Sequence, residues 1–241
     1  MGILTWFASV LLLIFVPVIV ALPYFIYIWR TRGVPNAEAL ANDKTFLFIS
    51  IVGVVPTHLL TLVVIWLVVT RGRKRPFWKT IGFEWPKSIG PVTGFALCLL
   101  ISVALLAVGA LVTWVGGGGK TQLDLLVESS IPARLATAFV AVFTAPLVEE
   151  LIYRGVLYSA VERTLGTAVA VTSVSLLFAG VHVFQYINNV AVITVITLLS
   201  ITLTLVRAYS GKVLPSFVIH LIFNGVQSVI IALSPFFGWG S

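Results

Sequence analysis

Long apolar stretches separated by short polar segments recur along the whole chain. Several of them exceed the roughly 20 residues that a helix needs to cross a hydrocarbon core about 30 Å thick. The pattern predicts an all-α fold, a polytopic membrane helical bundle with about seven transmembrane helices. The expected spans are residues 3–29, 45–69, 92–115, 135–158, 167–185, 189–206 and 213–233.

Composition supports a membrane protein and excludes an ordinary soluble domain. Of the 241 residues, 59% are hydrophobic and only 10% are charged, whereas soluble domains carry about 25% charged residues. The first apolar stretch is too long for a signal peptide and lacks a basic start, so we expect it to be a retained span. Cys98 is the single cysteine, which excludes an intrachain disulfide.

The basic residues predict how the bundle is oriented. An odd number of spans places the termini on opposite sides, and the side richer in Lys and Arg normally faces the cytoplasm. Short loops and the lack of a soluble domain favour a prokaryotic cell membrane, with the N-terminus cytoplasmic. The N-terminal side collects Arg71, Arg73, Lys74, Arg75, Lys79, Lys87, Arg163, Arg207 and Lys212, and the other side holds Arg30, Arg32, Lys44, Lys120 and Arg134.

Residues 71–90 mix basic and aromatic side chains. This mixture predicts a short helix lying at the level of the lipid head groups. Nucleic acid is the less favoured partner there, and we expect none. The glycine run 116–119 predicts a flexible linker. Four tryptophans fall near expected span ends, where amphipathic rings prefer the interface: Trp6, Trp29, Trp114 and Trp239.

Two adjacent glutamates interrupt the fourth apolar stretch. Ionisable residues inside a membrane are costly and indicate a functional site. Glu150 and Arg154 are four residues apart, in the favourable order for an ion pair on one helix face. Glu149 is turned by about 100 degrees from Glu150, so its partners must come from other helices. Pro146 predicts a kink close to this acid.

Two later spans carry further polar side chains. His182 follows Phe178 by one helical turn, and His220 lies one turn before Asn224 on the same face of the last span. We interpret His58, which has no comparable companions, as structural. By position along the spans, Glu149 and His220 lie toward the cytoplasmic side and His182 toward the other. These residues can meet only if the fifth helix is tilted, displaced or longer than expected.

The assembled set suits amide hydrolysis without a covalent intermediate. A carboxylate in a partly dry site can act as general base toward water, and a neutral histidine can position that water. A second histidine and an amide NH2 can stabilise an oxyanion. We therefore expect catalytic roles for Glu149, His182, His220 and Asn224, with Glu150 and Arg154 as a supporting ion pair.

Together, the motifs Glu149-Glu150-x-x-x-Arg154, Phe178-x-x-x-His182 and His220-x-x-x-Asn224 resemble the signature of the CPBP (Abi) family of intramembrane endopeptidases, which includes the CAAX prenyl endopeptidases. The resemblance implies a catalytic helical core at residues 131–241, after membrane helices and an amphipathic loop at residues 1–130. It also implies that Glu149 and His182 activate water, and that His220 and Asn224 stabilise the oxyanion.

The resemblance implies a membrane-associated peptide or protein as substrate, prenylated or a precursor. We expect no required cofactor. Zinc held by Glu149, His182 and His220 is the alternative, although the motif His-Glu-x-x-His is absent. Two other classes of protein stay open: a non-catalytic scaffold or immunity protein of the same fold, and a proton-coupled transporter. Transporters usually contain an internal repeat of spans, and this sequence shows none, which argues against the transporter.

Overall fold

The computed structural model describes residues 1–117, 119 and 121–233, and the regular secondary structure in these ranges is entirely helical. Six helical runs within them are long and apolar enough to cross a membrane, and a shorter apolar stretch, Thr167–Val183, lies in α11 (Thr167–Tyr186). The prediction of an all-α membrane bundle is confirmed. Trp239, Gly118 of the expected linker and Lys120 of the predicted charge pattern lie outside the described residues. The six runs are Gly2–Arg32, Lys44–Thr70, Pro91–Gly116, Ile131–Leu165, Val190–Ser210 and Leu214–Leu233.

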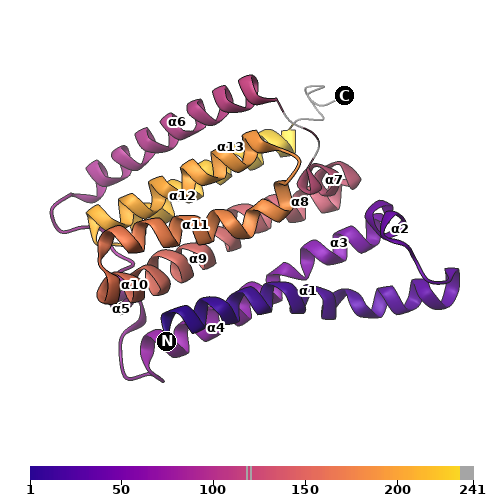
Figure 1. The fold of residues 1–241 in the computed structure, drawn as a ribbon, viewed down its shortest axis with the longest axis horizontal. Helices are drawn as coiled ribbons and strands as arrows, with labels where there is room; N and C mark the ends of the chain where they lie inside the picture. The colour runs from indigo at the N-terminus through magenta and orange to yellow at the C-terminus, as the bar shows by residue number, and fades with distance from the viewer. Residues whose placement is uncertain (118, 120, 234–241) are drawn as a thin grey trace.

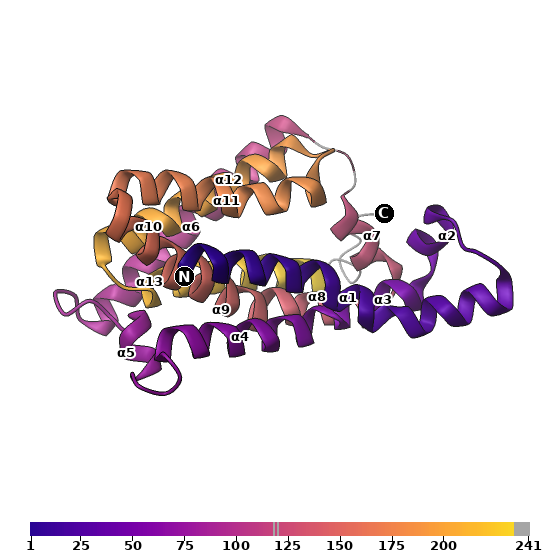
Figure 2. The ribbon, with the colours of Figure 1, turned by 60° about the horizontal axis from the view of Figure 1, so that its bottom comes forward.

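The long helices run back and forth between the two ends of the bundle, roughly along the horizontal axis of Figure 1. α1 (Gly2–Arg32) packs beside α4 (Val54–Thr70) at one edge. α6 (Pro91–Gly116) forms the opposite edge and packs on α12 (Val190–Ser210) and α13 (Leu214–Leu233). Figure 2 shows the same arrangement from another side, with the N-terminus near α10 and α5. The N-terminus and the end of α13 therefore lie at opposite ends of the bundle.

The second span is interrupted, although the sequence predicts it as one helix. α3 (Lys44–Val52) ends at Val52, and α4 starts at Val54, so Gly53 alone separates them. A Cβ atom at Gly53 would lie 3.1 Å from the Cα atom of Pro17 in α1. Glycine at this position lets the two backbones approach closely, so the break occurs where α1 crosses.

The fourth span contains two π-helical segments. It runs through α8 (Ile131–Phe139), η1 (Val140–Thr144), α9 (Ala145–Glu149), η2 (Glu150–Leu157) and α10 (Tyr158–Leu165). The Ala145 amide donates to the Val140 carbonyl, five residues earlier, just before Pro146. Proline removes one helical amide donor, and the expected break takes the form of this widened turn. The predicted end of the span, Tyr158, is wrong because the helix continues to Leu165.

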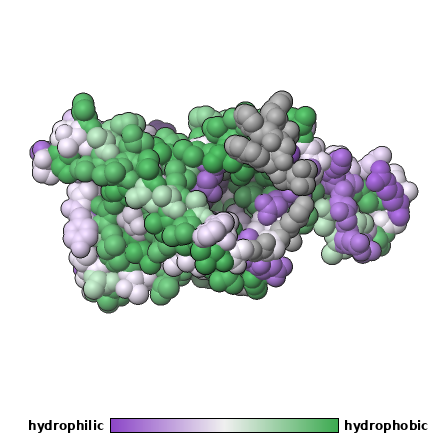
Figure 3. All heavy atoms as spheres, turned by 90° about the horizontal axis from the view of Figure 1, so that it is seen from above, coloured by the Kyte–Doolittle hydropathy of each residue, from purple (hydrophilic) through white to green (hydrophobic). Residues whose placement is uncertain are grey.

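Hydrophobic side chains cover much of the outer surface. Leu4, Phe15 and Ile19 of α1 and Leu100 and Val103 of α6 are all more than half exposed. In a bundle that spans a membrane, such faces contact lipid. Figure 3 shows one face of the molecule from above, with much hydrophobic surface and with hydrophilic residues at the end where α2 (Ala37–Asn42) lies.

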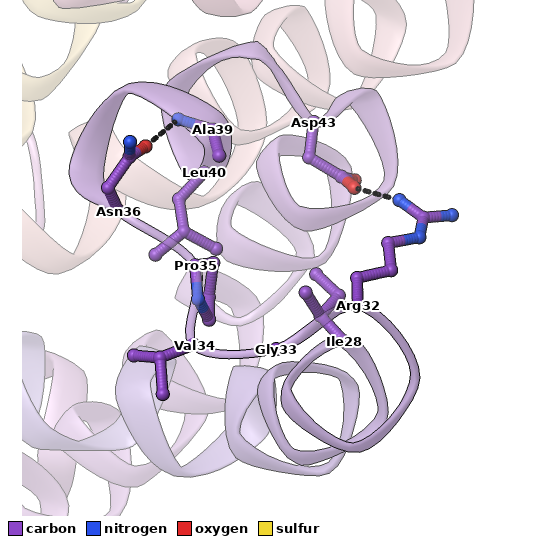
Figure 4. A pocket seen from close by; sticks show the side chains of 9 residues that line it. All are labelled: Ile28, Arg32, Gly33, Val34, Pro35, Asn36, Ala39, Leu40 and Asp43. Carbon is purple, nitrogen blue, oxygen red and sulfur yellow. Dashed lines mark hydrogen bonds and ion pairs between the residues drawn. The ribbon is translucent and has the colours of Figure 1, made fainter.

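A shallow pocket of about 230 Å³ lies at this hydrophilic end, between the end of α1 and α2 (Figure 4). The Asn36 side chain accepts from the Ala39 amide, and Arg32 forms an ion pair with Asp43 at 3.7 Å. Arg32 is largely exposed, so the pair adds little stability. The pocket lies at the opposite end of α1 from the helices that carry the predicted site residues, and none of those residues lines it.

Candidate active site

The Glu150 and Arg154 side chains form a buried ion pair inside η2. Arg154 Nη1 lies 2.9 Å from Glu150 Oε1, and both side chains are fully buried. On its other side, Arg154 Nη2 donates to the Ser200 carbonyl at 3.0 Å and to Thr204 Oγ1 at 3.3 Å. A buried charge needs a partner and further hydrogen bonds, and α12 supplies them. The pair thereby joins the fourth span to the sixth.

His220 lies between the two adjacent glutamates. Its Nδ1 atom is 3.0 Å from Glu150 Oε1, and its Nε2 atom is 3.7 Å from Glu149 Oε2. Beside Arg154 the Glu150 carboxylate is an acceptor only, so His220 Nδ1 carries a hydrogen and donates it. Glu150 thus fixes the orientation of the imidazole and directs Nε2 toward Glu149.

The two glutamates differ in their access to solvent. The Glu149 side chain is 23% exposed, whereas that of Glu150 is 0% exposed. Glu149 is therefore partly open to the outside of the protein, while Glu150 is occupied by Arg154 and His220. Two residues next to each other in sequence thus have different surroundings, as the helical turn between them predicts.

The Phe178 ring connects the remaining motif residues. It contacts His182, with ring centroids 4.8 Å apart, and His220, with centroids 6.0 Å apart. The Arg154 guanidinium lies 4.6 Å from the same ring, a cation–π arrangement. His182 Nδ1 donates to the Phe178 carbonyl at 2.8 Å, so the neutral ring has its unprotonated nitrogen at Nε2. Residues from all three motifs therefore lie around one aromatic ring.

Asn224 contacts the first π-helical segment. Its Nδ2 atom donates to the Ala141 carbonyl at 3.0 Å. An amide nitrogen carries two hydrogens, so one remains for another acceptor. This bond also joins α13 to η1, just before the helix that bears Glu149.

The predicted conflict in depth is resolved by the length of the fourth span. Glu149 precedes the end of α10 at Leu165 by about as many residues as His182 follows the start of α11 at Thr167. Only Gly166 separates these two helices. Since helices rise by a regular step, Glu149 and His182 lie at similar depth. The fifth helix needs no displacement.

His58 makes a contact that the sequence did not indicate. It is buried on α4, and its Nδ1 lies 2.8 Å from Thr144 Oγ1 in η1. The Thr144 hydroxyl donates to the Val140 carbonyl, so it accepts from His58. His58 thereby holds the segment that leads into Glu149. The sequence indicated only that His58 could matter, because an ionisable residue inside a membrane is a functional-site hypothesis by default. It did not indicate Thr144 as the partner.

Arg207 was predicted to lie in a loop on the cytoplasmic side, and this is wrong. It lies within α12 and is 8% exposed. Its Nε donates to the Arg154 carbonyl at 3.0 Å, and its guanidinium lies 4.9 Å from the Tyr158 ring. Wide π turns leave backbone groups poorly satisfied. Arg207 supplies a donor to η2 beside the Glu150–Arg154 pair.

The alternative metal-ligand set, Glu149, His182 and His220, can be compared with the geometry of the side chains. No group of three His, Cys, Asp or Glu residues able to hold a metal ion occurs in the described part of the chain. His220 Nδ1 is bonded to Glu150, and His182 Nδ1 to a backbone carbonyl. These two bonds leave Nε2 of each histidine as its available ring atom, so a reaction without a metal stays a prediction.

The family comparison matches this part of the molecule. Residues 131–226 match the model described as "Type II CAAX prenyl endopeptidase Rce1-like". These residues form an Rce1-like domain. The Rce1-like domain contains all three motifs, from Glu149 to Asn224, and it lies in a chain with several helices long and apolar enough to span a membrane. Comparisons with curated proteins and with solved structures found no match.

Proposed function

We propose that this protein is an intramembrane endopeptidase that uses Glu149 to activate water against a peptide bond. The observation that carries the proposal is the position of His220, which Glu150 holds on one side and which faces the accessible Glu149 on the other. Two acids with different surroundings can take different roles. Glu150 orients, and Glu149 reacts.

In the proposed reaction, Glu149 accepts a proton from water while the water oxygen attacks the peptide carbonyl carbon. The carbonyl oxygen becomes an oxyanion in a tetrahedral intermediate. When the carbon–nitrogen bond breaks, the leaving amine takes the proton that Glu149 holds, and the other product is a carboxylic acid. Transfer of its remaining proton to the amine or to solvent leaves a carboxylate. His182, with a free Nε2 acceptor in its neutral form, helps to position the water.

The oxyanion needs donors of fixed orientation. Asn224 has one amide hydrogen left after its bond to Ala141, and His220 offers Nε2–H when protonated. Glu150 accepts the Nδ1 hydrogen of this ring and so fixes its orientation. Preorganised donors of this kind each lower the barrier by roughly 3 kcal/mol.

The proposed substrate is a peptide or protein segment associated with the membrane. The description of the matching family model names a CAAX prenyl endopeptidase, which favours a prenylated segment, and a secreted precursor peptide is the alternative. We propose that the reaction requires no metal. Chelation is therefore expected to leave activity intact, and loss of activity that only added zinc restores would contradict this.

The test is cleavage of a farnesylated CAAX peptide by the full chain in proteoliposomes, with the unprenylated peptide in parallel. Glu149→Gln is expected to lower kcat about 10²- to 10⁴-fold, because the general base is lost. Glu38→Gln, an exposed change on α2, is the matched control and is expected to have no effect. Cleavage that survives Glu149→Gln would overturn the mechanism.

The rival functions give different results in the same vesicles. A non-catalytic scaffold would cleave neither peptide in any variant. A proton-coupled transporter would acidify the vesicle lumen on addition of a driven solute, and Glu149→Gln would abolish that flux without any cleavage in the wild type.

A further inference from the structure

A dense group of exposed cations lies where α4 leaves the membrane-spanning region. Arg71, Arg73, Lys74 and Arg75 follow the end of α4 at Thr70, and all four are exposed. Arg71 and Arg73 have positive φ angles, 49° and 73°, so the chain turns tightly here. None of the four forms an ion pair with a carboxylate in the part of the chain that the structure describes.

Aromatic side chains accompany these charges. Trp78 on α5 (Phe77–Ile81) is 53% exposed, and Arg73 lies 5.6 Å from the Trp66 ring of α4. Exposed amphipathic rings beside cations at the end of a span are typical of the lipid–water interface. This combination favours a lipid surface as the partner over nucleic acid or free phosphate.

The same segment is fastened to the Rce1-like domain. A Cβ atom at Gly155 in η2 would lie 2.6 Å from Ile81, so Ile81 occupies a notch that only glycine leaves open. The Val213 amide donates to the Gly82 carbonyl at 2.9 Å, and the Phe83 ring lies 5.2 Å from that of Phe217 on α13.

An ion pair between Lys212 and Glu84 adds to this attachment. The hydrogen bond from Lys212 and its positive charge hold the pKa of the exposed Glu84 carboxyl below its usual range. At neutral pH the Glu84 carboxyl is therefore ionised. The segment thus contacts η2 and the start of α13 through apolar, backbone and ionic interactions.

These attachment points adjoin the candidate active site. Gly155 directly follows Arg154, and Phe217 lies one helical turn before His220. A movement of residues 71–84 would therefore be transmitted to Arg154 and His220, which both contact Glu150. We propose that anionic lipid head groups bind at residues 71–79, and that this binding steadies η2 and α13 in the arrangement that the site requires. The effect on cleavage rests on the proposed function, whereas binding and steadying do not.

Binding is tested by energy transfer from the protein's tryptophans to pyrene-labelled phosphatidylglycerol, compared with pyrene-labelled phosphatidylcholine. The wild type is expected to enrich the anionic lipid. Lys74→Gln with Arg75→Gln is expected to reduce this enrichment by roughly 25-fold, since each cation near a charged surface contributes about a fivefold preference. The matched control, Arg30→Gln with Lys44→Gln, removes two exposed cations at the other end of the bundle and is expected to retain it.

Steadying is tested by hydrogen exchange of the η2 amides in both kinds of membrane. Exchange is expected to slow several-fold in phosphatidylglycerol for the wild type and the control, and to stay unchanged for the Lys74/Arg75 variant. Each of three results would overturn the proposal. They are equal enrichment of both lipids, competition by inorganic phosphate or RNA, and exchange rates that do not depend on lipid charge. Slower exchange without any cleavage would support it and contradict the proposed function instead.

Discussion

Glu149 and Glu150 are adjacent on one helix, yet their side chains differ in burial and in contacts. Glu150 is fully buried and shared by Arg154 and His220, whereas Glu149 is partly exposed. The sequence predicts the Glu150–Arg154 contact because both lie on one helix. It cannot predict that His220 shares the same carboxylate, since that contact joins residues seventy positions apart.

Stability distinguishes the two glutamates. Glu150→Gln is expected to destabilise the protein by about 3–5 kcal/mol, because it leaves Arg154 as an uncompensated buried charge. Glu149→Gln is expected to leave the Tm nearly unchanged. Thermal unfolding in detergent can be followed with a thiol-reactive dye, since Cys98 is buried and reacts only on unfolding. Equal losses for both variants would contradict the assigned roles.

His58 and Thr144 are expected to act as a pair. His58→Leu and Thr144→Val each remove one hydrogen bond, worth about 0.5–1.5 kcal/mol, and the double variant is expected to lose less than the sum. The same unfolding assay gives the three values. Strict additivity would mean that the contact between α4 and η1 contributes nothing.

At the scale of elements, the spans are predictable and their irregularities are not. Hydropathy locates each span, but the charges Glu162 and Arg163 end the apolar pattern before α10 itself ends. The π turns depend on partners from other helices, such as Arg207 on the Arg154 carbonyl. The break at Gly53 depends on the approach of α1.

The notch at Gly155 gives an element-scale prediction. Gly155→Ala is expected to cost about 1–3 kcal/mol, because the added methyl group overlaps Ile81. Ile81→Ala in the same chain removes the overlapping atoms and is expected to recover part of the loss. A double variant less stable than either single one would show that residue 81 does not fill this notch.

At the scale of the whole molecule, the alternation of spans places residues 71–90 and the N-terminus at one end of the bundle (Figure 1). Even without Arg207, which lies within α12, that end has more Lys and Arg residues than the other end. A cytoplasmic N-terminus therefore stays the prediction from charge. The sequence suffices for this because orientation depends on loop charges, not on packing.

Orientation is tested with single cysteines in a Cys98→Ser background. Lys74→Cys is expected to resist a membrane-impermeant maleimide in intact cells and to react after lysis. Asn36→Cys, at the other end of the bundle, is expected to react in intact cells. The reverse pattern would invert the assignment.

The Phe178 ring touches Arg154, His182 and His220 at once. A single fluorine on this ring would therefore serve as a magnetic resonance probe, whose chemical shift senses the protonation of either imidazole. Titrating such a labelled sample would follow both histidines without a substrate or an assay.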